Sequence, residues 1–239
     1  MKETELFPPV KLLLESLGFN VYAEARNCDV VGRKKEELVI VELKKNLNLT
    51  LLSQGMQRQK LTHQVFLCVP EPGKKNSSTR SKEELIKRLG LGLITVYRSP
   101  VRSAAKIMFE PSTENRINVR ERKKLIAELD NRSVNLNIGG SHRVPIYTAY
   151  KETSIVVANL LKKAGPTKLK NIRRFAGEKT DNILSKNVYG WFKRVKRGEY
   201  EIGEMGIKEL KKFKEINTLL CNREDFRVFC DYLKHENTK

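Results

Sequence analysis

Residues 28–44 constrain the fold of this chain more than any other stretch, because they have the pattern of a β-hairpin. Two runs rich in β-branched residues, 29–33 and 38–44, flank a polar segment, which predicts antiparallel strands joined by a four-residue loop over 34–37. If Arg33 pairs with Leu38, the same register pairs Asp29 with Glu42. Opposite residues have Cβ atoms about 4.5–5.5 Å apart. The sequence therefore predicts two neighbouring carboxylates.

Lys44 follows Glu42 by two positions, so it is expected on the same face of the hairpin as both acids. Like charges opposite each other destabilise a sheet, and the apolar run before Glu42 indicates a buried strand. A divalent cation between Asp29 and Glu42 would relieve this repulsion, and oxygen ligands favour Mg²⁺ or Mn²⁺ over zinc. The alternative is an ordinary buried ion-pair cluster formed by the same three residues.

Charge composition narrows the choice of partners. The chain has 239 residues, a hydrophobic fraction of 39% and a charged fraction of 31%, as expected of a soluble globular protein. Its formal net charge is +19, from 47 Lys and Arg against 28 Asp and Glu. Such an excess favours a polyanionic partner, with nucleic acid first. A generally lysine-rich surface is the alternative explanation.

Several classes of protein are disfavoured. The polar start of the sequence and its lack of a long apolar run argue against a signal peptide and a membrane partner, so we expect a cytoplasmic protein. The four cysteines form no Cys-x-x-Cys pair, and the three histidines do not stand at metal-ligand spacing from them, so no zinc or iron–sulfur site is expected. No complete P-loop is present either.

The order of elements predicts an α/β fold. A helix is expected from Phe7, where two prolines suit a first turn, to Gly18, and Asn48 is expected to cap a later helix. The pattern gives helix, three strands, helix, strand, helix and strand, which is typical of helices packed around a mixed sheet. The expected ranges after the first helix are 20–25, 29–33, 38–44, 49–61, 64–69, 82–89 and 93–97, with an edge strand at 106–110.

Further polar residues are candidates for the same site. A two-residue turn at 26–27 would place Glu24 opposite Asp29 as a third carboxylate, although a solvated edge-strand position is equally consistent. Gln54, Gln57 and Arg58 have helical spacing and form one polar stripe. That stripe faces the carboxylates, a phosphate backbone or only solvent.

These residues carry a family resemblance. Asp29, then Glu42-Leu43-Lys44 at the end of an apolar strand, then a helix with Gln54, resembles the PD-(D/E)XK nuclease superfamily. In more detail, the chain is similar to a bacterial family of PD-(D/E)XK phosphodiesterases, domain of unknown function 2161, over nearly its whole length. The segments that carry this resemblance are 6–11, 24–31, 39–44 and 52–59. It implies a restriction-endonuclease-like αβββαβ core with a mixed sheet, and hydrolysis of a phosphodiester with Mg²⁺ or Mn²⁺.

The resemblance also implies roles for the residues. Asp29, Glu42 and the backbone carbonyl of Leu43 would hold the ion, and Lys44 would position the attacking water and stabilise negative charge. Gln54, as a catalytic candidate, and Arg58 would support the site or the phosphate. Gln57 and Arg58 of the polar stripe are also candidates for contact with the nucleic acid. Many members take another acid from the first helix, for which the candidates are Glu5, Glu15 and Glu24. An inactive relic kept for binding is the alternative.

The texture of the sequence changes near residue 112. We expect a nuclease-like domain at 1–112, a linker with a charged helix at 113–144, a second domain at 145–213 and a helical tail at 214–239. In the second domain a long helix precedes two short ones, expected to be capped by Thr167 and Asp181, and a hairpin turning at 197–198. This order resembles a winged helix-turn-helix.

The second domain is also rich in cations, which predicts contact with phosphates. Winged helices also serve as protein-interaction modules, so that alternative stays open. We expect a nuclease to which the basic domain delivers nucleic acid, DNA first; an inactive DNA-binding regulator and a protein-assembly module are the other two hypotheses. The candidate phosphate contacts are Lys168, Lys170, Arg173, Arg174, Lys186, Lys193, Arg194, Lys196 and Arg197.

Overall fold

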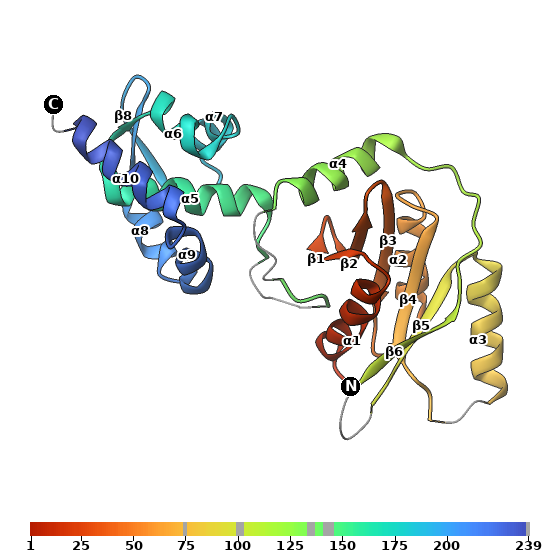
Figure 1. Ribbon diagram of the computed structural model, residues 1–239. Coiled ribbons are helices and arrows are strands. Elements are labelled where there is room, and N and C mark those ends of the chain that lie inside the picture. The colour runs from red at the N-terminus through yellow and green to blue at the C-terminus, as the bar shows by residue number, and fades with distance from the viewer. Residues whose placement is uncertain (74–75, 99–102, 133–136, 141–145, 238–239) are drawn as a thin grey trace. The chain divides into compact units, whose positions relative to one another are not determined.

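A computed structural model describes residues 1–73, 76–98, 103–132, 137–140 and 146–237 (Figure 1). The chain divides into two compact units. The first unit comprises Met1–Asn131 with Asn135–Ile146, and the second comprises Arg132–Val134 with Tyr147–Lys239. In the part of the chain described, no helix has the length and apolar character needed to cross a membrane.

The first unit is built on a six-stranded sheet whose strands lie in the order of the sequence (Figure 1). The two outer pairings at one edge and the last pairing at the other are antiparallel, while the third, fourth and fifth strands are mutually parallel. This mixed sheet confirms the predicted α/β fold class. The strands are β1 (Asn20–Ala25), β2 (Cys28–Lys34), β3 (Glu37–Leu43), β4 (Gln64–Pro70), β5 (Gly92–Tyr97) and β6 (Ala104–Phe109).

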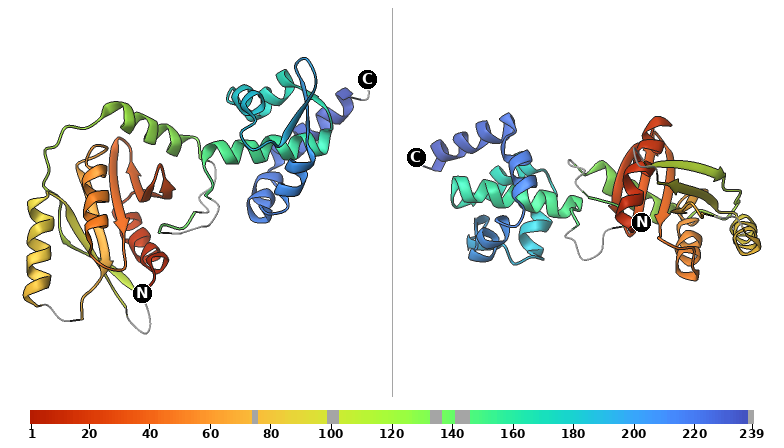
Figure 2. Two further views of the ribbon diagram at one scale, coloured as in Figure 1. Left: turned by 180° about the vertical axis from the view of Figure 1, so that it is seen from behind. Right: turned by 90° about the horizontal axis from the view of Figure 1, so that it is seen from below.

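Helices cover both faces of this sheet (Figure 2). Leu6 and Val10 of the first helix pack on one face, with the odd-numbered residues of β3. Leu51 and Ile86 anchor the next two helices on the opposite face, and Leu125 of the fourth helix packs beside Ile40 of β3. These helices are α1 (Glu3–Ser16), α2 (Leu49–Arg58), α3 (Ser77–Arg88) and α4 (Val119–Asp130). The charged helix expected in a linker thus packs against the sheet of the first unit.

Helix α1 begins earlier than the sequence predicted. It starts at Glu3, so Pro8 and Pro9 lie inside the helix and not in its first turn. The start is fixed by Glu5, whose Oε2 accepts a hydrogen bond of 2.9 Å from the backbone N–H of Lys2. A carboxylate in the first turn satisfies a donor that has no helical partner, which explains why the helix extends ahead of the prolines.

The β2–β3 hairpin has the predicted register with a tighter turn. Arg33 pairs with Leu38 as expected, and Lys34 also pairs with Glu37. The loop therefore contains two residues where four were predicted, and Lys35 adopts a left-handed conformation with φ of 54°. The register is unchanged, because extending both strands by one residue keeps every pair opposite its partner.

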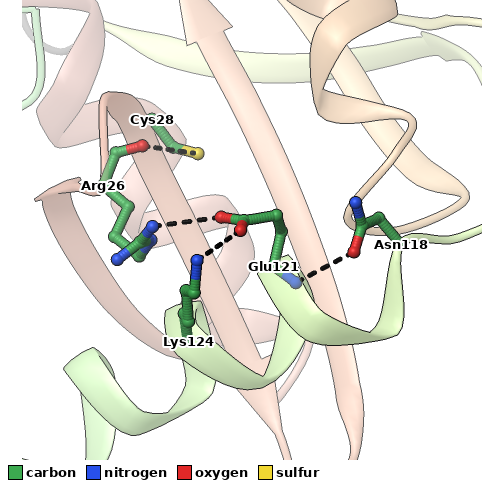
Figure 3. A network of polar contacts seen from close by, with 5 residues as sticks. All are labelled: Arg26, Cys28, Asn118, Glu121 and Lys124. Carbon is green, nitrogen blue, oxygen red and sulfur yellow. Dashed lines mark hydrogen bonds and ion pairs between the residues drawn. The ribbon is translucent and has the colours of Figure 1, made fainter.

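The β1–β2 turn is tied to α4. Arg26 and Asn27 form the turn with φ of 46° and 67°, the left-handed conformation expected for Asn27. Arg26 Nη2 lies 3.1 Å from Glu121 Oε2, and Lys124 Nζ lies 2.5 Å from Glu121 Oε1 (Figure 3). Cys28 Sγ lies 4.0 Å from the Arg26 carbonyl oxygen. These contacts hold α4 over the turn that precedes Asp29.

The second unit is mainly helical with a small antiparallel sheet. Its three strands lie in the order β7-β9-β8. Trp191 and Phe192 are buried in its core. The elements are α5 (Ala149–Ala164), β7 (Thr167–Lys168), α6 (Leu169–Ala176), α7 (Thr180–Lys186), β8 (Phe192–Lys196), β9 (Glu199–Ile202), α8 (Glu204–Leu210), α9 (Lys214–Cys221) and α10 (Glu224–Asn237).

Two predicted helix caps in this unit are wrong. Thr167 belongs to β7, where its Oγ1 donates a hydrogen bond of 2.9 Å to the carbonyl oxygen of Gly165. Asp181 lies inside the first turn of α7 and forms an ion pair with Arg173. In both cases a polar side chain found a local partner other than the helix N-terminus, which spacing along the sequence does not reveal.

Candidate functional site

The two predicted acids lie where β2 begins and β3 ends, on neighbouring strands of the sheet. The paired register ends at Val30 and Val41. One residue further along each strand, Asp29 Oδ2 accepts a hydrogen bond of 2.8 Å from the backbone N–H of Leu43. Glu42 has an exposed fraction of 0%. A buried carboxylate therefore stands next to one that is fixed by the backbone of the same strand.

The pKa values of both acids are raised, which shows that their negative charges are poorly stabilised in the metal-free protein. Burial raises the pKa of Glu42 to about 7, and the neighbouring charge of Asp29 pushes it in the same direction. Burial likewise raises the pKa of Asp29. Glu24 adds to the rise at Glu42, so its charge also acts on this site. Such shifts are the signature of like charges gathered out of water.

Two cationic side chains lie near the acids, and each forms an ion pair with a different carboxylate. Arg58 Nε lies 2.6 Å from Glu42 Oε1, and the Arg58 side chain is only 12% exposed. Lys44 Nζ lies 3.3 Å from Glu3 Oε2 of α1, and the Lys44 charge lowers the pKa of Asp29. The site thus contains ion pairs, but they are not the cluster of Asp29, Glu42 and Lys44 that the alternative hypothesis predicted. The partner of Glu42 is Arg58, and the partner of Lys44 is Glu3.

Two buried side-chain oxygen atoms, one on Glu42 and one on Gln54, lack a hydrogen-bond donor among the described residues. Among the residues described, Glu42 Oε2 and Gln54 Oε1 are buried and accept no hydrogen bond. A carboxylate and an amide oxygen are acceptors only, and leaving one unsatisfied costs about 1–3 kcal/mol. A cation satisfies such atoms, and hard oxygen donors suit Mg²⁺ or Mn²⁺.

The donor set for an ion is sparse but consistent with these metals. In the described ranges, no three His, Cys, Asp or Glu side chains form a metal-binding group. The donors that the predicted site offers are the carboxylates of Asp29 and Glu42 and the carbonyl oxygen of Leu43. Mg²⁺ usually keeps several water ligands and uses one or two carboxylates, so this set fits it.

The first-helix acid that lies next to the predicted site is Glu3, which the sequence analysis did not name. Glu3 lies in the first turn of α1 with its carboxylate beside Lys44, and its charge raises the pKa of Asp29. The candidate Glu5 is exposed and caps the helix, while Glu15 pairs with a lysine of its own helix, Lys11, at 3.7 Å. An earlier helix start, signalled by the acidic residues ahead of the prolines, would have identified Glu3.

The connector after α4 passes against the site. A Cβ atom built on Gly139 would lie 2.8 Å from the carbonyl oxygen of Asp29, and one on Gly140 would lie 3.0 Å from Glu3 Cβ. Asn137 is buried and donates a hydrogen bond of 3.3 Å to the carbonyl oxygen of Ala23. Only glycine fits this close approach, so residues 139–140 pack directly against the backbone of Asp29 and the start of α1.

The polar stripe on α2 divides into two roles. Arg58 points to the sheet, where it contacts Glu42 and also donates through Nη2 to the carbonyl oxygen of Asn27. Gln54, one helical turn earlier, has a buried amide oxygen. Gln57 is exposed. The structure therefore brings Arg58 to the acids, buries the amide oxygen of Gln54 and leaves Gln57 at the surface.

The predicted phosphate contacts of the second unit are all at its surface. Arg173 is paired with Asp181, and Lys196 Nζ lies 3.0 Å from Glu199 Oε2. Lys193 and Arg197 lie on the β8–β9 hairpin. The exposed cations are Lys168, Lys170, Arg173, Arg174, Lys186, Lys193, Arg194, Lys196 and Arg197.

Comparison with known proteins finds one matching family model. Residues 94–209 match the family described as "Putative PD-(D/E)XK phosphodiesterase (DUF2161)", which is the family named from the sequence, and this match supports a hydrolase. The match covers just under half of the chain, whereas the sequence resemblance was expected over nearly its whole length. No curated protein and no solved structure matches the chain. The matched residues run from β5 into α8 and include Gly139 and Gly140, whereas the acids and Lys44 lie ahead of the match.

Proposed function

Starting from this match to a family of PD-(D/E)XK phosphodiesterases, we propose that the protein is a nuclease that hydrolyses nucleic acid, DNA first, with Mg²⁺ or Mn²⁺. One observation carries the proposal. Glu42 is fully buried beside Asp29, with one oxygen bonded to Arg58 and the other lacking a donor among the described residues. A carboxylate held in this way is suited to bind a cation.

The residues around Glu42 take distinct roles in this proposal. Asp29, Glu42 and the carbonyl of Leu43 hold the ion. When bound, the ion supplies Lewis-acid stabilisation and a more acidic water. Lys44, kept beside Asp29 by its ion pair with Glu3, orients the attacking water and offsets the negative charge that develops on the phosphate.

We further propose that the second unit binds the substrate as a winged helix. Its order of helix, strand, two helices and hairpin, with the three strands paired as β7-β9-β8, supports this interpretation. The exposed cations of α6, α7 and the β8–β9 hairpin are suited to phosphates. Binding of this kind weakens steeply with salt because bound counterions are released.

A cleavage assay tests the catalytic part of the proposal. Labelled single- and double-stranded DNA and RNA are incubated with the full chain and Mg²⁺, Mn²⁺ or a chelator. We expect metal-dependent cleavage by the native protein and by Lys35→Ala, which alters the far end of the same hairpin. Glu42→Ala and Lys44→Ala are expected to abolish cleavage. Cleavage that persists in both variants would remove the assigned site.

A second candidate function is nucleic-acid binding without catalysis. The ion pair between Arg58 and Glu42 favours it, because a protein side chain already supplies one positive charge to the acids. This function predicts salt-sensitive retention of DNA with no cleavage under any metal. The same assay, run with a gel-shift lane for each reaction, separates the two functions.

A further inference from the structure

Arg58 connects the site to two different parts of the sheet. Its Nε donates to Glu42 Oε1 at 2.6 Å, and its Nη2 donates to the carbonyl oxygen of Asn27 in the β1–β2 turn. The side chain is 12% exposed. One planar guanidinium therefore joins the end of β3 to the turn that leads into β2, from a position mostly out of contact with solvent.

Two opposite roles are compatible with a cation next to a metal-binding acid. Arg58 either takes the place of the ion, in which case it competes with metal, or fixes the carboxylate, in which case it helps metal to bind. The contacts distinguish these roles. A substitute for a shared ion would donate to both acids, but Arg58 donates to Glu42 and to a backbone carbonyl.

The oxygens that are left over point to the second role. Glu42 uses Oε1 for Arg58, and no described residue donates to its Oε2. Asp29 is held in a similar way, through Oδ2, by the backbone N–H of Leu43. Each acid is thus anchored to the protein through one oxygen, which fixes its orientation without occupying both donor atoms.

We propose that Arg58 is a positioning residue that holds Glu42 so that Oε2 is presented to the divalent ion, and that Arg58 does not contact the phosphates of the substrate. This inference rests on the proposed function. It selects one of the two roles that the sequence left open for Arg58, which were support of the site and contact with the phosphate of nucleic acid. Groups that orient a metal ligand in this way contribute about 10–100-fold to metal affinity.

The geometry also explains why the residue is arginine. The two contacts use two nitrogen atoms of one rigid plane, directed at acceptors on different elements. A lysine at this position would keep the charge but has a single nitrogen on a flexible stem. Arg58→Lys is therefore expected to restore charge balance without restoring the orientation of Glu42.

The test measures Mn²⁺ binding to the full-length protein without nucleic acid. The concentration of free Mn²⁺ is read from its electron paramagnetic resonance signal. We expect the dissociation constant to rise about 10–100-fold in Arg58→Gln, with Arg58→Lys between that variant and the native protein. Arg88→Gln, which removes an exposed arginine from α3, is expected to bind like the native protein. Tighter binding in Arg58→Gln would show competition and overturn the inference, and unchanged binding would overturn it as well.

A second readout separates positioning from phosphate contact. DNA affinity is measured with a chelator present, across a range of salt concentrations. We expect the slope of log affinity against log salt to be the same for Arg58→Gln and the native protein, whereas loss of one phosphate contact would reduce it by about 0.9. Such a reduction would overturn the inference.

Folding is controlled by thermal unfolding of each variant, and Arg58→Lys carries the test if Arg58→Gln does not unfold cooperatively. The failures of the two proposals are distinguishable. If the native protein itself binds no Mn²⁺, the proposed function fails together with the inference. If the native protein binds Mn²⁺ and both variants match it, only the inference fails.

Discussion

The two units of the protein treat charge in opposite ways. The first buries acids: Glu42 has no exposed surface, and its pKa rises to about 7 because of that burial and of Asp29. The second displays cations such as Lys193 and Arg197 at its surface, where water and salt screen them. A buried negative charge requires a cation to stabilise it, whereas an exposed positive charge is available to a polyanion. We expect chemistry from the first unit and binding from the second.

The strongest way to break this comparison is to remove Lys44. Lys44→Ala is expected to lower the cleavage rate at least about 100-fold, because a cation that stabilises the transition state is lost. DNA affinity should stay within about twofold of the native value, since the cations of the second unit are intact. Single-turnover kinetics and a filter-binding assay measure the two effects. Equal losses of cleavage rate and DNA affinity would show that catalysis and DNA binding are not separated between the two units.

Acidic pH should weaken metal binding through Glu42. Its raised pKa, about 7, means that the folded protein holds a proton there which an ion must displace. We expect Mn²⁺ affinity to fall as the pH drops from 8 to 6, by about tenfold for each unit below 7 if one proton is displaced. Titrations at several pH values measure this. A flat profile, with Glu42→Gln also binding normally, would contradict the assignment.

The same carboxylate should affect stability with the opposite dependence on pH. Because folding raises the pKa of Glu42 from 4.5 to about 7, the metal-free folded state binds more protons than the unfolded state in this interval. The contribution to the free energy of unfolding is present below pH 4.5 and is lost as the pH rises through 7, on the order of 1–3 kcal/mol. Urea unfolding of the native protein and of Glu42→Gln isolates it.

The exposed cations allow a subtler test on the second unit. The double substitution Lys193→Gln with Arg197→Gln is expected to weaken DNA binding several-fold and to reduce the slope of log affinity against log salt by about 2. Mn²⁺ binding should not change. Lys214→Gln in α9 is the matched control. A slope equal to that of the native protein would remove the β8–β9 hairpin from the proposed interface.

The smallest expected effect concerns the connector. Gly139→Ala places a Cβ 2.8 Å from the carbonyl oxygen of Asp29, so the connector or the acid must shift. We expect the free energy of unfolding to fall by about 1–3 kcal/mol, with weaker Mn²⁺ binding. Gly73→Ala is the control, because a Cβ there meets no atom within 4 Å. Equal stability of the two variants would show that Gly139 does not pack tightly against the backbone of Asp29.

The sequence predicted the strand pairing of the first unit because local rules determine it. Strand pairing at Arg33 and Leu38 follows from alternation and turn geometry, and it survived a wrong loop length. The partner of Glu42 was not predictable in the same way. Arg58 and Glu42 meet only because α2 packs back on β3, and Glu3 reaches Lys44 only because α1 begins before its prolines. Contacts between elements depend on packing, which spacing alone does not encode.

The central claim is that Asp29 and Glu42 hold a divalent ion, and a crystal soaked in Mn²⁺ tests it most directly through anomalous scattering. We predict a peak bonded to Glu42 Oε2 and to Asp29, with Arg58 still on Glu42 Oε1. No peak at this position, at a Mn²⁺ concentration that supports cleavage in solution, would contradict the account.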